Sequence, residues 1–123
     1  MLRLSLAMAI TAATSMAADP PGSITFHRDV LPILAKDCQG CHRPGQIAPM
    51  PFLTYETTRP WAQQIKVVVS SKKMPPAVSN PHFPVLTGRD GLTQAEIDIL
   101  VKWVDSGAPE GTPPADERGS KKK

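Results

Sequence analysis

The sequence has little of what several protein classes require. It holds only two cysteines, Cys38 and Cys41, and these stand so close together that no disulfide framework can staple a fold. Aromatic residues make up 5% of the chain, which leaves little large apolar surface for a core. The apolar run over residues 4–13 is too short to span a bilayer, so we expect no membrane span once the N-terminal segment is removed.

An excess of charge of one sign is also missing from the body of the chain. The formal net charge is +3, but Arg3 and the three lysines at 121–123 supply more positive charge than this value. A domain without a basic patch is not expected to bind nucleic acid. We also find no paired carboxylates, nucleophile triad or phosphate-binding loop, so the sequence does not indicate an enzyme that acts on a substrate.

The two ends differ in composition from the middle. Arg3, the apolar run and the small residues Ser15 and Ala17 predict a signal peptide over residues 1–17, cleaved after Ala17 and followed by export. The alternative is an uncleaved anchor. Residues 112–123 are rich in proline, glycine and charge, which predicts a disordered basic tail. One domain over residues 18–111 remains.

Proline is abundant, with 14 residues in the chain. This favours long ordered loops over continuous sheet and long helices. Apolar residues recur at helical spacing in three stretches, near residues 26–37, 57–73 and 93–107. We therefore predict an all-α fold with long Pro-rich loops.

Pro32 complicates the first helix, since it lies within the apolar stripe that begins at Phe26. Either Asp29 caps a helix in which Pro32 falls in the first turn, or Thr25 caps a longer helix that kinks at Pro32. Both solutions end the helix near Asp37. The second helix is expected to have an N-cap at Thr57 or Thr58 and an apolar face of Trp61, Ile65 and Val68.

The last helix has the strongest local signals. Thr93 and Glu96 match the two positions of a capping box, and Gly107 is the expected C-cap. The predicted apolar stripe consists of Ile97, Leu100, Val101 and Val104, with Trp103 beside it.

Residues 38–42 read Cys38-Gln39-Gly40-Cys41-His42, and this C-x-x-C-H pattern is typical of covalent c-type haem attachment. Two thiols must reach the two vinyl groups on one edge of a porphyrin, and the adjacent imidazole must turn under the iron. We predict one haem c, attached through Cys38 and Cys41, with His42 as an axial iron ligand.

Two other kinds of site share part of this pattern. A redox dithiol would need a strand–helix–strand unit around the motif, and no strand-like run precedes it. A zinc site needs about four ligands in all, which His27 and His82 could complete together with the two cysteines.

The iron needs a sixth ligand unless its distal side stays open. Met50 and Met74 are the methionines that remain after residues 1–17 are removed. Thioether sulfur favours ferrous iron and raises the reduction potential, as suits an electron carrier. Met50 follows His42 too closely to reach the opposite face without strain, whereas Met74 has ample chain. We predict Met74 as the ligand; His82, Met50 and an open site are the alternatives.

These motifs resemble those of class I c-type cytochromes. The chain also resembles cytochrome-like modules of environmental bacteria in which C-x-x-C-H-x-P-G precedes M-P-P and W-V-x-x-G-A-P; the matching segments are residues 38–45, 74–76 and 103–109. Such modules are often fused to redox enzymes, including copper-dependent monooxygenase-like domains. The resemblance covers about residues 25–111. The spacing from His42 to Met74 is shorter than in longer class I members.

The resemblance implies a small cytochrome c-like fold, in which about three to four helices surround one covalent haem and the last helix crosses the first. It implies that the Pro44 carbonyl accepts a hydrogen bond from the His42 ring. It also implies a periplasmic electron carrier that meets redox partner proteins, as a monomer or as a subunit of a redox complex.

Two further points stay open at this level. The indole of Trp61 either bonds a haem propionate or packs with its N–H on backbone or water. The alternative function is a haem enzyme or gas sensor with an open distal site, lined by His82 or Arg89.

Overall fold

The computed structural model describes residues 18–76 and 91–118. Every regular element in these two ranges is a helix, which confirms the predicted all-α class for the described chain. None of these helices has the length and hydropathy needed to cross a membrane. The predicted signal peptide, the loop with His82 and Arg89, and the lysines at 121–123 lie outside the described residues.

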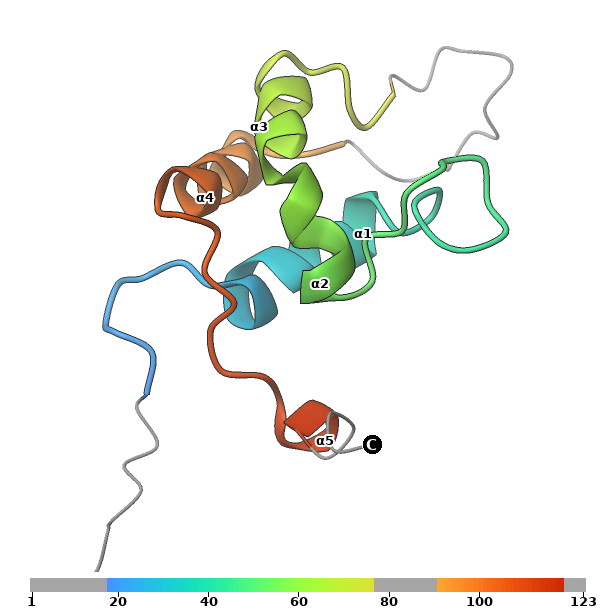
Figure 1. Cartoon of the computed structure of the whole chain (residues 1–123). Coiled ribbons are helices and arrows are strands. Elements are labelled where there is room, and N and C mark those ends of the chain that lie inside the picture. Colours follow the sequence, from blue (N-terminus) through green and yellow to red (C-terminus); the bar gives the residue numbers. More distant parts are fainter. Residues whose placement is uncertain (1–17, 77–90, 119–123) are drawn as a thin grey trace, which may run out of the picture.

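The helices form three main stretches and a short C-terminal turn. In chain order they are η1 (Phe26–Val30), α1 (Leu31–Asp37), α2 (Tyr55–Thr58), η2 (Arg59–Trp61), α3 (Ala62–Ser70), α4 (Gln94–Asp105) and α5 (Ala115–Arg118). α4 contacts both α3 and η1, and Figure 1 shows α3 and α4 together above the η1–α1 stretch. The core therefore lies where these three stretches meet. Its largest fully buried side chains are Trp103, Phe26, Leu34, Leu100 and Val30.

The first stretch starts after Thr25, as in the longer of the two predicted solutions, but the Thr25 hydroxyl makes no capping hydrogen bond. η1 is a π-helix, in which the Leu31 N–H bonds to the Phe26 carbonyl. Pro32 then falls in the first turn of α1, where its lack of an N–H removes no hydrogen bond of that helix. The wide turn lets the helix continue past the proline. Asp29 is not the cap of α1, since its carboxylate accepts the Thr25 N–H at 2.7 Å.

The second stretch begins earlier than predicted. Thr54, rather than Thr57 or Thr58, is the N-cap of α2, and its hydroxyl accepts the Thr57 N–H at 3.2 Å. The predicted apolar face is wrong for Trp61, whose side chain is 37% exposed. η2 interrupts the regular α-helix at Trp61. The helical spacing that places Ile65 on the buried face of α3 therefore does not extend back to Trp61. The buried face of α3 consists of Ala62, Ile65 and Val69.

The last helix confirms its predicted caps. The Thr93 hydroxyl accepts the Glu96 N–H at 3.2 Å, and the Glu96 carboxylate accepts the Thr93 N–H at 2.8 Å. Gly107 has a φ of +93° just after the helix, and the next N–H, of Ala108, bonds back to the Trp103 carbonyl at 2.9 Å. The buried face consists of Ile97, Leu100, Trp103 and Val104, so Trp103 takes the place expected for Val101.

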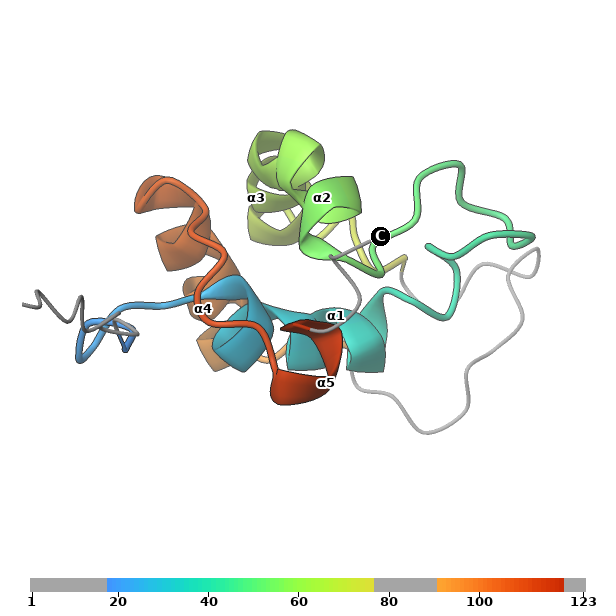
Figure 2. The same cartoon turned by 60° about the horizontal axis from the view of Figure 1, so that its bottom comes forward.

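The chain after α4 returns along the first helix, and Figure 2 shows α5 beside it. The N–H groups of Phe26 and His27 bond to the carbonyls of Pro109 and Glu110, at 3.0 and 3.3 Å. These N–H groups start the helix and have no partner within it, so the returning chain satisfies them. Within the segment predicted to be disordered, residues 115–118 form the short helix α5, and the Glu117 carboxylate lies 3.5 Å from the His27 ring.

Candidate functional site

The first helix delivers the C-x-x-C-H loop, as predicted. α1 ends at Asp37, and the N–H groups of Cys38 and Gln39 both bond to the Leu34 carbonyl, at 2.9 and 2.8 Å. This bonding closes the helix and fixes where the loop starts. Cys38 is half-buried and packs against the core.

A tight turn brings the other two motif residues close to Cys38. The N–H groups of Cys41 and His42 bond to the Cys38 carbonyl, at 3.2 and 2.9 Å. All three side chains are partly exposed, and both thiols are free. The structure thus brings together Cys38, Cys41 and His42, and these can offer a cofactor two attachment points and one nitrogen ligand.

The His42 ring is held in one tautomer. Its Nδ1 lies 2.9 Å from the backbone oxygen of Met50. A carbonyl oxygen can only accept, so Nδ1 carries the proton and the neutral ring keeps its lone pair on Nε2. Ligand histidines in metalloproteins commonly have this arrangement, because the bond at the first nitrogen orients the ring for the second.

The prediction that Pro44 supplies this carbonyl is wrong. Pro44 is exposed, and the chain after it folds back over the motif. The Ala48 N–H bonds to the Cys41 carbonyl at 3.3 Å, and the Phe52 N–H bonds to the His42 carbonyl at 3.0 Å. These two bonds, rather than the turn at the proline, bring the Met50 carbonyl to the ring.

Phe52 is a site residue that the sequence did not reveal. Its ring stacks on the His42 ring, with centroids 4.3 Å apart and planes 18° from parallel. Its carbonyl accepts a bond of 2.8 Å from the Gln39 side-chain amide. In the sequence, Phe52 is an apolar residue in a proline-rich loop that has no helical or strand periodicity. Without such periodicity, its neighbours in the fold could not be predicted.

Cys38 differs from the reactive cysteine of a redox dithiol. Burial raises the pKa of the Cys38 thiol to about 12, with smaller contributions from Asp37 and Cys41. Thiol–disulfide exchange needs thiolate, and catalytic cysteines have a lowered pKa for that reason. The environment of Cys38 therefore favours a neutral thiol.

A zinc site that includes His27 does not form. The His27 ring lies beside Glu110 and Glu117, with nitrogen–oxygen distances of 3.3 and 3.5 Å. No group of three or more histidine, cysteine or acidic side chains that could hold a metal ion occurs within residues 18–76 and 91–118. His82, the other ligand considered, lies outside these ranges.

Met74 and Trp61 are both surface residues. Met74 follows α3 in a turn, where its N–H bonds to the Val68 carbonyl at 3.2 Å and its side chain is 40% exposed. Figures 1 and 2 show residues 71–76 and the loop after α1 on the same side of the molecule. Met74 is therefore not part of the core of the described chain.

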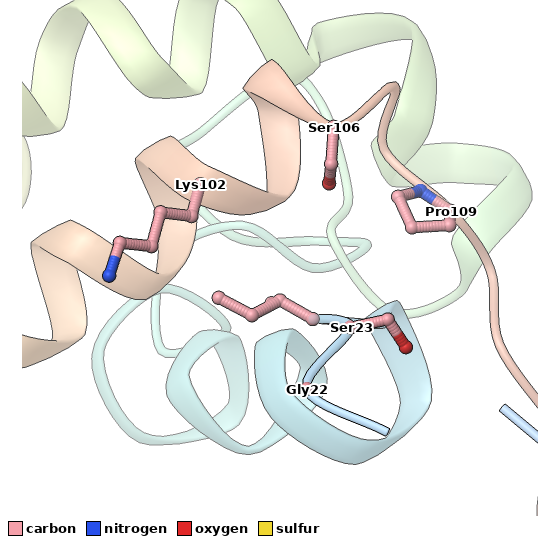
Figure 3. A pocket seen from close by; sticks show the side chains of 6 residues that line it. Gly22, Ser23, Lys102, Ser106 and Pro109 are labelled. Carbon is pink, nitrogen blue, oxygen red and sulfur yellow. The ribbon is translucent and has the colours of Figure 1, made fainter. Parts of the chain in front are cut away.

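Two pockets of the described chain lie away from the motif. The first, of about 290 Å³, opens between residues 22–24, which precede η1, and α4, as Figure 3 shows. The second, of about 210 Å³, lies between η2 and the end of α4. The first is lined by Gly22, Ser23, Ile24, Lys102, Ser106 and Pro109. No predicted site residue lines either pocket.

Comparison of the chain with protein-family models, with curated proteins and with solved structures finds no significant match. What the protein does is therefore inferred from its own residues and contacts.

Proposed function

We propose that the protein is an exported mono-haem c-type cytochrome that transfers electrons. Cys38 and Cys41 would attach haem c, and His42 and Met74 would ligate its iron. The observation that carries the proposal is the state of the His42 ring. Its Nδ1 is bonded to the Met50 carbonyl at 2.9 Å, on the same tight turn as both thiols, so that Nε2 keeps the lone pair.

The segment that follows the motif in the sequence carries exposed apolar side chains that a bound apolar group could cover. The exposed large hydrophobic side chains of the described residues all belong to the segment from residue 47 to residue 74, and they are Ile47, Leu53, Trp61, Val67 and Met74. Single exposed apolar residues are normal, but their concentration in one segment that adjoins the attachment loop is what a chain built to bind an apolar cofactor would have.

The proposal includes a cytochrome c-like fold. The first helix leads directly into the attachment loop, and the last helix packs on it. The Phe26 and Trp103 rings meet at this contact, with centroids 6.0 Å apart. This agrees with the helix crossing that the resemblance implies.

Each residue has a separate role in this proposal. The haem supplies one-electron redox chemistry when bound. His42 binds through Nε2, and its bond to the Met50 carbonyl increases the basicity of the ring. Met74 offers a soft sulfur that stabilises ferrous iron. Trp61 is 37% exposed, and its indole N–H could donate to a propionate.

The protein would then be an electron carrier rather than an enzyme, and its partners would be redox proteins. It would act in the periplasm after removal of residues 1–17, alone or as a subunit of a redox complex. An open distal site, which would suit gas binding or catalysis, is the competing function that the first experiment must separate.

The test is periplasmic expression together with a c-type haem maturation system. We expect the purified chain to keep its haem in denaturant and to give the pyridine haemochrome spectrum of two thioether links. The ferric protein should show the weak far-red band of methionine-ligated haem. Met74→Ala should lose this band, and Met50→Ala, the matched control, should keep it.

Two results would count against the proposal. If the wild-type chain carries no covalent haem, the proposal is wrong, and Cys38 and Cys41 would instead form a thiol or metal site. Identical spectra for wild type and Met74→Ala would remove Met74 from the iron and favour His82 or an open distal site.

A further inference from the structure

Two contacts of different kind restrain the His42 ring. The hydrogen bond from Nδ1 to the Met50 carbonyl fixes which nitrogen holds the proton, but a single bond of this kind lets the ring turn about its own axis. The stacked Phe52 ring, 18° from parallel, blocks that rotation, because the imidazole cannot turn without colliding with the phenyl face.

Phe52 is itself tied to the attachment loop at both of its backbone polar groups. Its N–H bonds to the His42 carbonyl at 3.0 Å, and its carbonyl accepts the Gln39 amide at 2.8 Å. Its side chain is 7% exposed and belongs to the core. The phenyl ring is thus a rigid surface whose position is set by the loop that it supports.

We infer that Phe52 is a positioning residue for the iron ligand, because its ring sets the plane of the His42 imidazole. Gln39 in turn fixes the position of Phe52 relative to the attachment loop. This inference rests on the proposed function. A ligand that is already fixed in one orientation loses little rotational freedom on binding a metal. When haem is bound, the fixed orientation of the His42 ring would tune the electronic state of the iron that it ligates.

A second core phenylalanine provides a matched control. Phe26 is 0% exposed, and its aromatic neighbours are Trp103, Tyr55 and His27, at centroid distances of 6.0, 5.5 and 5.3 Å. Replacing Phe26 by leucine removes a buried ring of the same size as in Phe52→Leu. Only the Phe52 substitution removes a ring that touches His42.

The experiment compares haem-loaded wild type, Phe52→Leu, Phe52→Tyr and Phe26→Leu by electron paramagnetic resonance and by redox titration. We expect Phe52→Leu to shift the g-values of the ferric protein and to change the reduction equilibrium constant by about threefold or more, since outer partners of metal ligands have effects of this order or larger. Phe52→Tyr, which keeps the stacked ring, should restore both values. Phe26→Leu should lower stability and leave both unchanged.

The outcomes separate this inference from the proposed function. Wild type without covalent haem would overturn both. Haem-loaded Phe52→Leu with wild-type g-values and equilibrium constant would overturn the positioning role and leave the proposed function intact. If Phe52→Leu does not fold, Gln39→Leu decides, because it keeps the ring and removes its anchor. Altered g-values in Gln39→Leu support the inference, and unaltered g-values overturn it.

Discussion

Cys38 shows how strongly burial can change the acidity of a single side chain. It packs against the core at the end of α1, and burial raises the pKa of its thiol to about 12. The thiolate fraction near neutral pH is therefore far smaller than that of an unfolded cysteine. Attachment of haem at this residue would have to occur before the site closes or with help from a maturation system.

The first prediction concerns the reactivity of this thiol. In the haem-free Cys41→Ser variant at a pH of about 8, we expect iodoacetamide to modify Cys38 at least about tenfold more slowly than in the same chain unfolded in urea. Mass spectrometry of samples taken over time measures both rates. Equal rates would contradict the burial of Cys38 in the haem-free chain.

The second prediction concerns Gly111, where the returning chain passes Thr25. Its φ is +75°, and a Cβ built there would lie 2.4 Å from the Cβ of Thr25. We expect Gly111→Ala to lower the free energy of unfolding by about 2 kcal/mol or more, from backbone strain and a steric clash together. Urea unfolding followed by circular dichroism measures this.

Gly22→Ala is the matched control for the clash. Gly22 has a similar φ of +80°, but nothing lies within 4 Å of the added Cβ. This substitution should therefore lower the free energy of unfolding by about 1 kcal/mol, from backbone strain alone. Equal losses for the two variants would show that the C-terminal segment does not pass close to Thr25.

At the scale of elements, the capping box of α4 is also an ion-pair site. The Glu96 carboxylate accepts the Thr93 N–H and lies 2.5 Å from the Lys36 ammonium of α1. Lys36 and the Thr93 N–H lower the pKa of Glu96 below its ordinary value of 4.5. The interaction thus joins the first helix to the start of the last one.

The third prediction is the pH dependence that follows. A carboxyl group with a lowered pKa in the folded state stabilises the protein above its ordinary pKa, and this stability is lost as pH falls through the lowered value. Glu96→Gln should therefore lose less stability than wild type between pH values of about 5 and about 3. Urea unfolding at a series of pH values checks this. Lys36→Met should weaken the effect, and parallel curves for wild type and Glu96→Gln would contradict it.

These elements also show what the sequence could predict. The caps of α4 were predictable because Thr93, Glu96 and Gly107 act within a few residues of one another. The start of α2 was missed because Thr54, Thr57 and Thr58 are all acceptable caps, and tertiary packing selects among them. The π-turn before Pro32 was not predicted, although a kinked longer helix was one of the two expected solutions.

The candidate site also has a part that the sequence could predict and a part that it could not. The positions of Cys38, Cys41 and His42 follow from a contiguous motif after a helix. The partners of the His42 ring do not, because Met50 and Phe52 reach it only through the fold of a loop without periodicity. The resemblance implied that the Pro44 carbonyl bonds to the His42 ring. The backbone hydrogen bonds of this loop place the Met50 carbonyl there instead.

For the whole molecule, the proposed haem would be part of the core. The buried hydrophobic residues number 13 in the described ranges, and large apolar side chains remain exposed between residues 47 and 74. A chain of this length buries a modest fraction of its apolar surface, so a large covered cofactor contributes strongly to stability.

The last prediction is that stability depends on covalent attachment. Cys38→Ala/Cys41→Ala, expressed with the maturation system, should carry no covalent haem and unfold at a temperature lower by at least about 10 °C, because the attached porphyrin would be buried, and its iron ligated, only in the folded chain. Thermal unfolding followed by circular dichroism, with haem content measured on the same samples, tests this.

Met74→Ala is the control, because it removes one proposed iron ligand and keeps both attachment points. If the stabilising effect comes mainly from burying the porphyrin, this variant should unfold close to wild type. A large loss in Met74→Ala would instead mean that the iron–sulfur bond holds the segment after α3 onto the rest of the fold. Identical unfolding of wild type and the double cysteine variant would show that the chain completes its core without a covalent cofactor.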